Sequence, residues 1–278
     1  NFEGSVGIEL ESQEGGHMPA LDKEIVVDPW EDIPDDIDSI PAPSMQAYVV
    51  HADPYIAVVP NFLTQPEIDH LIELTQGKWV RSEVDFVANG KPKHTTGSGQ
   101  ANISDGHRTS STCVIDVGQT PIVQRVEERL ADLVNMELIN LEVLSLVKYT
   151  PGQYFKEHHD GEYRPWTVFL YLNSLPPDDE GETHFMNIGL KVAPRAGCAV
   201  IWPNAKPDGS RDDLLMHQGL APLTGVKYGI NCFFNKKHVR RPEHNVRTCP
   251  RQLRPPDIWS PVEDKDGFAL GNLFACCG

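Results

Sequence analysis

Two histidines and an aspartate stand next to one another at His158, His159 and Asp160. In an extended segment alternate side chains point to the same face, so His158 and Asp160 would converge while His159 would point away. Imidazole nitrogens and carboxylate oxygens both bind divalent transition metals. The pair therefore supplies half of a metal site, and a further ligand must come from elsewhere in the chain.

The predicted third ligand is His217, which lies 57 residues beyond Asp160. His184 is the alternative, although a polar residue on the outer face of a strand is its commoner role. Two histidines and one carboxylate on one face of a metal leave the opposite coordination positions open, as in the non-haem Fe(II) oxygenases. With 11 histidines in the chain, an ordinary ion pair between a histidine and an aspartate is the competing interpretation.

A second feature that could do chemistry is Lys227, which follows a Thr-Gly turn and begins a run of residues suited to a buried strand. A buried ammonium group is costly unless a carboxylate pairs with it. Either a protein Asp or Glu or a small dicarboxylic ligand is expected as its partner.

Composition limits the classes of protein to be considered. The chain has 278 residues, of which 40% are hydrophobic and 23% charged, enough for one large domain or two small ones with a real core. The net charge of -16 argues against nucleic-acid binding, because such a surface repels phosphate backbones. No apolar run reaches 18 residues, so no membrane span is expected, and the start lacks the pattern of an intact signal peptide.

The six cysteines do not identify the cellular compartment, because they are too few for a disulfide scaffold and form no C-x-x-C pair. The endoplasmic reticulum or secretory pathway and the cytoplasm both stay possible. Residues 1–45 contain twelve acidic side chains and the single basic residue Lys23, which predicts a flexible acidic N-terminal tail.

The elements that must position the candidate site begin near Tyr48. A strand is expected at residues 55–59, followed by a helix that starts with a capping box of Thr64 and Glu67. A second helix is expected to begin at Thr120 and Pro121. Between them, residues 89–106 form a polar loop, which is either a lid over a binding site or a plain connector.

From residue 141 onward the pattern changes to short β-rich runs separated by turns. Strands are expected at residues 144–149, 167–172, 183–186, 198–202 and 229–234. Short strands of this kind predict a sandwich or a barrel, with the helices supplied from earlier in the chain.

Several motifs in register resemble those of the Fe(II)- and 2-oxoglutarate-dependent dioxygenases, in particular the prolyl 4-hydroxylase family. The family has an R-T-S triplet, a Y-x-x-G-Q-x-Y-x-x-H-x-D block, a Y-L-N strand with G-G-E-T-x-F, and a final H-x-G-C-P-V-x-x-G-x-K-W block. The corresponding segments are residues 108–110, 149–160, 171–173 with 180–185, and 217–228. The resemblance extends from about residue 55 to residue 235.

This resemblance implies an α+β fold, a double-stranded β-helix (jelly-roll) core with N-terminal supporting helices. The dioxygenase domain would occupy residues 46–238, with its metal-binding core at about 141–236, and residues 239–278 would be a Pro-rich C-terminal tail of unknown role. Fe(II) would be held by His158, Asp160 and His217. Lys227 would pair with the distal carboxylate of 2-oxoglutarate.

Other positions receive weaker roles. Tyr149 and Thr183 fall where family members contact the cosubstrate, and for Thr183 an ordinary strand residue is an equal alternative. Arg108, from the R-T-S triplet, would contact substrate, position a loop or form a structural salt bridge. Trp202 would lie against the reaction pocket or belong to the core.

The implied reaction is hydroxylation of a peptidyl proline with O2 as oxidant, release of succinate and CO2, and ascorbate as reductant. The same chemistry on a lysyl side chain or a small molecule is the alternative, and a non-catalytic jelly-roll binding module is the third. Departures from the family pattern bear on the substrate and not on the reaction type. They are Phe155, Glu180, Leu220-Ala221-Pro222 and Tyr228.

Overall fold

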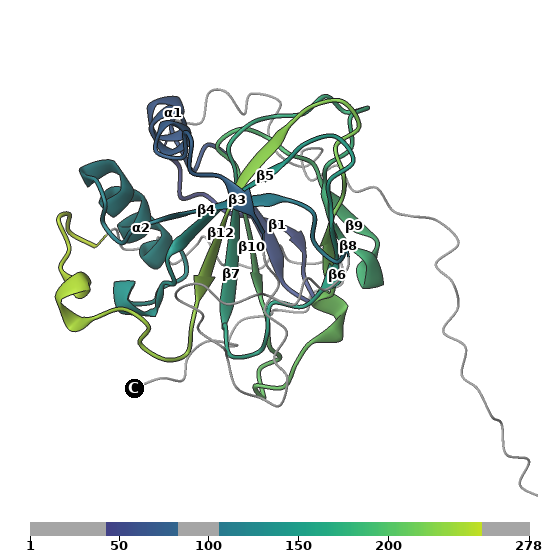
Figure 1. Cartoon of the computed structure of the whole chain (residues 1–278). Coiled ribbons are helices and arrows are strands. Elements are labelled where there is room, and N and C mark those ends of the chain that lie inside the picture. The colour runs from purple at the N-terminus through teal and green to yellow at the C-terminus, as the bar shows by residue number, and fades with distance from the viewer. Residues whose placement is uncertain (1–42, 83–105, 252–278) are drawn as a thin grey trace, which may run out of the picture.

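The computed structural model describes residues 43–82 and 106–251 (Figure 1). The predicted flexible tail therefore lies outside the described residues except for positions 43–45, as does the polar loop at 89–106 except for Gly106. The C-terminal tail is described as far as Arg251.

Two antiparallel sheets form the core of the described part of the chain. One has the strand order β1 (Tyr48–His51), β2 (Ile56–Val59), β10 (Ala199–Pro203), β7 (Trp166–Tyr171), β12 (Lys227–Phe234), β5 (Leu144–Tyr149), β4 (Ser111–Ile115) and β3 (Val80–Arg81). The other has the order β6 (Phe155–His158), β11 (His217–Gly219), β8 (Thr183–Phe185) and β9 (Leu190–Val192). We call them the large and the small sheet. The predicted jelly-roll core is confirmed.

Strand β7 explains how the large sheet is covered on both faces. All six of its residues are buried, as expected for a central strand with a continuous apolar run. Val168 and Leu170 belong to a hydrophobic cluster shared with the helices. Phe169 and Tyr171 belong to a second cluster, which includes Phe185 of the small sheet. The alternation of side chains along β7 thus divides the interior into two cores.

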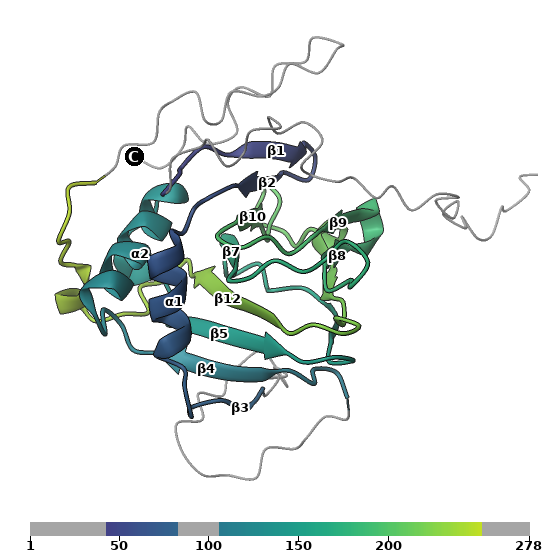
Figure 2. The ribbon, with the colours of Figure 1, turned by 90° about the horizontal axis from the view of Figure 1, so that it is seen from above.

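Two α-helices, α1 (Gln65–Glu73) and α2 (Pro121–Leu133), lie on the face of the large sheet opposite the small sheet (Figure 2). The predicted capping box is present, because Thr64 accepts from the Glu67 amide and Glu67 accepts from the Thr64 amide. The short 3-10 helices are η3 (Leu138–Asn140), η4 (Met186–Ile188), η5 (Asp213–Leu215) and η6 (Pro242–Asn245). Both predicted α-helices are confirmed at their N-terminal ends.

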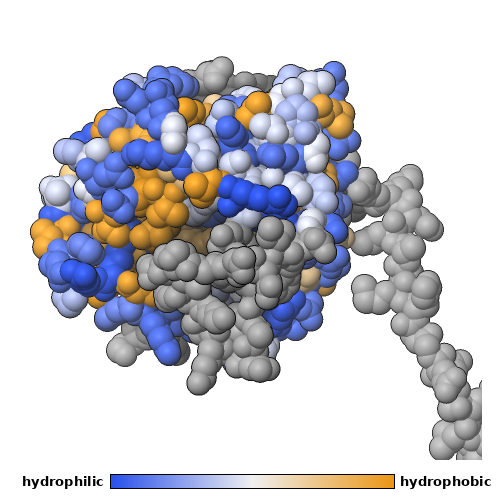
Figure 3. All heavy atoms as spheres, viewed as in Figure 1, coloured by the Kyte–Doolittle hydropathy of each residue, from blue (hydrophilic) through white to orange (hydrophobic). Residues whose placement is uncertain are grey.

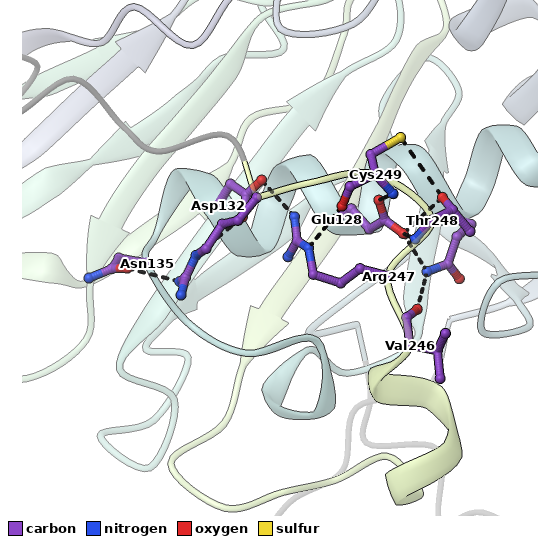
Figure 4. A network of polar contacts seen from close by, with 9 residues as sticks. Glu128, Asp132, Asn135, Val246, Arg247, Thr248 and Cys249 are labelled. Atoms are coloured by element: carbon purple, nitrogen blue, oxygen red, sulfur yellow. Dashed lines mark hydrogen bonds and ion pairs between the residues drawn. The ribbon is translucent and has the colours of Figure 1, made fainter.

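The described end of the C-terminal tail packs against α2 (Figure 4). The Glu128 carboxylate accepts hydrogen bonds from the backbone amides of Thr248 and Cys249. Arg247 Nη2 lies 2.7 Å from Asp132 Oδ2. These contacts join residues beyond β12 to a helix that packs on the large sheet.

A buried ion pair connects an earlier part of the same tail to α2. Arg240 Nη1 and Nη2 donate to the two carboxylate oxygens of Glu127 at 2.9 and 2.8 Å. The exposed fractions of these side chains are 2% for Arg240 and 0% for Glu127. Burial raises the pKa of Glu127, and the hydrogen bonds from Arg240 oppose that shift.

The surface gives no sign of a membrane span. In the described residues, no helix has both the length and the hydrophobicity to cross a bilayer. Figure 3 shows hydrophobic residues gathered near α2 and the neighbouring strands. Val80 of β3 and Val114 of β4 are among the exposed large hydrophobic residues. Cys113, Cys198, Cys232 and Cys249 are free thiols.

We expect Arg240→Met to lower the free energy of unfolding by about 3–5 kcal/mol, because it leaves the Glu127 carboxylate buried without its partner. The matched control is Arg241→Met. Arg241 lies 3.8 Å from Glu243 in a pair whose side chains are 80% and 62% exposed, and its loss should cost no more than about 1 kcal/mol. Urea unfolding followed by tryptophan fluorescence measures both. Equal effects of the two substitutions would contradict the role of the buried pair.

Candidate active site

The antiparallel pairing of β6 with β11 places His158 directly opposite His217. Their ring centroids lie 4.3 Å apart. Strand β6 ends at His158, and two residues later the Asp160 carboxylate lies beside both rings. Asp160 Oδ1 lies 3.6 Å from His158 Nε2, and Asp160 Oδ2 lies 3.6 Å from His217 Nε2.

The backbone determines which nitrogen of each histidine carries a proton. His158 Nδ1 lies 2.8 Å from the Lys156 carbonyl oxygen, and His217 Nδ1 lies 3.0 Å from that of Leu215. A carbonyl oxygen only accepts, so each Nδ1 must donate. In the neutral ring Nε2 then keeps its lone pair. Both lone pairs are therefore available beside the Asp160 carboxylate.

Electrostatics favour the same protonation states. Burial, together with the nearby His217, lowers the pKa of His158 to about 3, so this imidazole is neutral at pH 7. Burial would raise the pKa of Asp160, but His217, His158 and Arg164 hold it below its usual value. Neutral imidazole and ionised carboxylate are the forms that a divalent cation requires.

His159, which was predicted to point away, and His184, the alternative third ligand, are not part of this cluster. His159 Nδ1 accepts a hydrogen bond from the Gly161 amide at 3.0 Å, and His184 Nδ1 lies 3.1 Å from Gln218 Nε2. Among the described residues, the one group of three or more potential ligands is His158, Asp160 and His217, whose ligand atoms lie within 4.8 Å of one another. The structure thus brings together the predicted set, and its binding of metal stays a prediction.

Lys227 is buried, with an exposed fraction of 1%. Its Nζ donates to the Gly181 carbonyl oxygen at 2.6 Å and lies 4.9 Å from the Tyr149 ring centroid. Burial lowers the pKa of Lys227 to about 7, and Glu182 opposes this shift. Of the two partners expected from the sequence, a protein carboxylate within ion-pair distance is absent from the described part of the chain.

Gly219 keeps space open between the lysine and the histidines. It follows His217 by two positions and pairs with Thr183. A Cβ atom on Gly219 would lie 3.6 Å from the Tyr149 hydroxyl and 3.8 Å from Lys227 Nζ. The absent side chain leaves a cradle bordered by a hydroxyl and an ammonium group, which suits a carboxylate ligand.

Thr183 has a partner inside the protein. Tyr171 donates its hydroxyl proton to the Val192 carbonyl oxygen at 2.8 Å, so the Thr183 hydroxyl, at 2.7 Å, must donate to the Tyr171 oxygen. These two bonds satisfy the buried hydroxyl group of Tyr171. Burial raises the pKa of this hydroxyl group. The Thr183 oxygen keeps its acceptor capacity, and its predicted contact with cosubstrate stays a prediction.

Aromatic rings flank both histidines. Trp202 meets the His217 ring edge-on at a centroid distance of 5.0 Å, and its indole Nε1 is buried without a hydrogen-bond partner. Phe155 stacks on His158 with a centroid distance of 3.6 Å. On the sequence alone Phe155 was only a departure from a motif, and nothing in the pattern indicated this stacking.

Arg108 lies over the Phe155 ring, with its guanidinium carbon 4.6 Å from the ring centroid. Its Nε donates to Ser110 Oγ at 2.9 Å, whereas its Nη2 is buried without a partner. None of the carboxylates in the described residues pairs with it. The structural salt bridge considered from the sequence therefore finds no support.

Comparisons with known proteins agree with this geometry. The 2OG-Fe(II) oxygenase superfamily matches residues 144–235. Probable prolyl 4-hydroxylase 11 of Arabidopsis thaliana is 34% identical over 184 residues, which cover 61% of this chain and 63% of that protein. Probable prolyl 4-hydroxylase 8 of the same plant is 30% identical over 216 residues, 67% of this chain and 70% of that protein. The chain belongs to the prolyl 4-hydroxylase family of 2OG-Fe(II) oxygenases.

The fold agrees with that of a solved family member. A viral collagen prolyl hydroxylase from Paramecium Bursaria Chlorella virus-1 superimposes with a TM-score of 0.51 at 21% identity, covering 66% of this chain and 97% of that one. Membership of the 2OG-Fe(II) oxygenases implies Fe(II), 2-oxoglutarate and O2. The residues fit these groups, because the donor set is two imidazole rings and a carboxylate and because Lys227 has no carboxylate partner in the described part of the chain.

The buried Lys227 predicts a specific pH dependence of stability. Its pKa is 10.5 in an unfolded chain and about 7 in the folded protein. Between these values the unfolded chain binds more protons, so this group makes the free energy of unfolding rise with pH from about 7 towards 10.5. Without ligand, Lys227→Met should therefore gain stability over the wild type at pH 7, and the gain should shrink by pH 9. A gain that is the same at both pH values in urea titrations would contradict the lowered pKa.

Proposed function

We propose that this protein is an Fe(II)- and 2-oxoglutarate-dependent dioxygenase that hydroxylates a peptidyl proline. The observation that carries the proposal is the convergence of two imidazole lone pairs and one carboxylate at His158, Asp160 and His217. An ordinary ion pair would not require both rings to present Nε2 to the same carboxylate. A metal site does require this arrangement.

His158, Asp160 and His217 would hold the iron, with the opposite positions left for cosubstrate and O2. Fe(II) with 2-oxoglutarate supplies the activation of O2, in which the oxo acid is converted to succinate and CO2 while one oxygen atom enters the substrate. Ascorbate is proposed as the reductant on the strength of the family resemblance. What the chain itself contributes is binding, orientation and exclusion of water.

Lys227 would bind the distal carboxylate of 2-oxoglutarate. Its ammonium group is buried beside the Gly219 cradle and the Tyr149 hydroxyl. A charge-assisted bond in such a dry place is strong. The ligand would also restore the lysine's charge, because a pKa of about 7 in the free protein rises when an anion arrives. Tyr149 would add a hydroxyl contact, and Thr183 could add one only if its proton turned from Tyr171 to the ligand.

The substrate would enter beside His158, whose side chain is 17% exposed while those of Asp160 and His217 are each 6% exposed. Phe155 and Arg108 lie at this side of the cluster. A proline ring could pack on aromatic carbon, and the unpartnered Arg108 Nη2 could donate to a peptide carbonyl oxygen. An extended proline-containing peptide also loses little entropy when it docks. Trp202, on the His217 side, would help to keep water out.

Two alternatives make different predictions. Oxidation of a lysyl side chain or a small molecule would use the same iron and 2-oxoglutarate site, and Phe155 in place of a tyrosine leaves this choice to experiment. A non-catalytic binding module would be expected to lose a candidate metal ligand or Lys227, and all four of these residues are present. The geometry therefore favours an enzyme.

We expect the metal-free protein to bind one Co(II) ion as a substitute for Fe(II). His158→Ala, Asp160→Ala and His217→Ala should each abolish this binding because each removes a ligand. The matched control is His159→Ala, which removes a neighbouring imidazole that lies outside the cluster. Isothermal calorimetry measures the affinities. Loss of Co(II) binding in His159→Ala with retention in His158→Ala would contradict the assigned ligands.

The proline assignment is tested by mass spectrometry of a peptide panel incubated with the iron-loaded enzyme, 2-oxoglutarate and ascorbate. We expect a gain of one oxygen atom on proline together with succinate formation. Lys227→Ala should need a much higher 2-oxoglutarate concentration while retaining its metal. Oxidation of lysine or of a free small molecule, with proline never modified, would refute the substrate and leave the iron and 2-oxoglutarate chemistry standing.

A further inference from the structure

A chain of hydrogen bonds connects the Asp160 carboxylate to Thr167 of β7 and on to Asn204. Thr167 Oγ1 donates to Asp160 Oδ2 at 2.8 Å. Asn204 Nδ2 lies 2.8 Å from Thr167 Oγ1 and 3.0 Å from the Arg164 carbonyl oxygen. Sequence analysis placed residue 167 only in a strand and gave residue 204 no role.

The direction of every bond in this chain follows from chemistry. An ionised carboxylate only accepts, so the single hydroxyl proton of Thr167 must go to Asp160. The Thr167 oxygen can then only accept, and it accepts from the Asn204 amide. The second amide proton of Asn204 goes to the Arg164 carbonyl oxygen. Because both partners of Nδ2 are acceptors, the Asn204 amide cannot be flipped without losing both bonds.

Burial makes these bonds exclusive. Thr167 has an exposed fraction of 1% and Asn204 of 0%, so water does not compete for them. Thr167 lies in β7, and Asn204 directly follows the end of the adjacent strand β10, in which Trp202 pairs with Thr167. The large sheet therefore holds the donor that faces Asp160.

Asp160 needs such support more than the two histidines do. His158 and His217 lie opposite each other in paired strands, whereas Asp160 lies beyond the end of β6. Arg164 holds its backbone through a 3.1 Å bond to the carbonyl oxygen. The Thr167 hydroxyl is what holds the carboxylate itself.

We propose that Thr167 and Asn204 are positioning residues that orient the Asp160 carboxylate for metal binding, an inference that rests on the proposed metal centre. Thr167 occupies one acceptor site of Oδ2 and limits rotation of the carboxylate. Asn204 orients the Thr167 hydroxyl. Removal of hydrogen-bond partners of metal ligands typically weakens metal affinity by about 10–100-fold.

The test is titration of the metal-free protein with Mn(II), with the free ion measured by electron paramagnetic resonance. Thr167→Val keeps the shape of the side chain and removes the hydroxyl, and it should weaken Mn(II) binding by about 10–100-fold. Thr167→Ser restores the hydroxyl and should restore the affinity. Thr167→Ala provides a second variant without hydroxyl in case the valine variant does not fold.

The matched control is Thr75→Val. Thr75 is 1% exposed and donates to the Ile72 carbonyl oxygen at 2.6 Å, at the end of α1 and outside the candidate site. This variant should lose stability and keep its Mn(II) affinity.

A double-mutant cycle tests Asn204. Asn204→Ala should weaken Mn(II) binding less than Thr167→Val does, and the double variant should bind no more weakly than Thr167→Val alone.

The outcomes separate the two proposals. Wild-type protein that binds no Mn(II) would refute the metal centre itself. Wild-type binding that is unchanged in Thr167→Val and Thr167→Ala would overturn only the positioning role. Failure of Thr167→Ser to rescue, or full additivity of the Asn204→Ala effect, would also overturn it, because the effect would then not pass through the hydroxyl.

Discussion

The pairing of two short strands, β6 and β11, is the constraint on which the candidate site depends. Their register places His158 opposite His217. A shift of one residue would turn every side chain of a strand to the other face and would put His159 or Gln218 where a ligand now stands. Both histidines also donate Nδ1–H to a carbonyl oxygen two residues earlier in the chain. One local backbone arrangement thus determines position, tautomer and ligand geometry together.

The two sheets supply different residues of the candidate site. The small sheet supplies the histidines and Gly219, while the large sheet supplies Lys227, Thr167 and Trp202. Lys227 lowers the stability of the ligand-free protein, because its buried ammonium group has no carboxylate partner among the described residues. In the free protein it is destabilising near neutral pH, and a dianionic ligand would supply the missing charge. Burial of Lys227 thus lowers the stability of the ligand-free protein and favours binding of an anion.

Sequence predicted those parts of the fold whose signals are local. The strand at residues 144–149 and the starts of both helices match β5, α1 and α2, because apolar periodicity and capping chemistry act within a few residues. Other strand ends differ by one or two residues, as at 183–186 against Thr183–Phe185. Strand β9, with only three residues, is too short for a periodic signal.

The sequence predicted the types of ligand residue in the candidate site but not the residues that position them. Alternation indicated that His158 and Asp160 converge, and they do so although Asp160 lies beyond the end of the strand. The partners of Thr167 and Asn204 are far apart in sequence, and no spacing rule indicates them. The same holds for Arg240 and Glu127, which are 113 residues apart. Such contacts depend on tertiary packing, which a single sequence does not display.

X-ray absorption spectroscopy at the iron edge of the anaerobic Fe(II)-loaded protein tests the central claim most directly. The account predicts two imidazole ligands, with oxygen atoms in the remaining positions. A spectrum with three imidazoles would bring His159 or His184 into the site and contradict the account. So would a spectrum with fewer than two imidazoles.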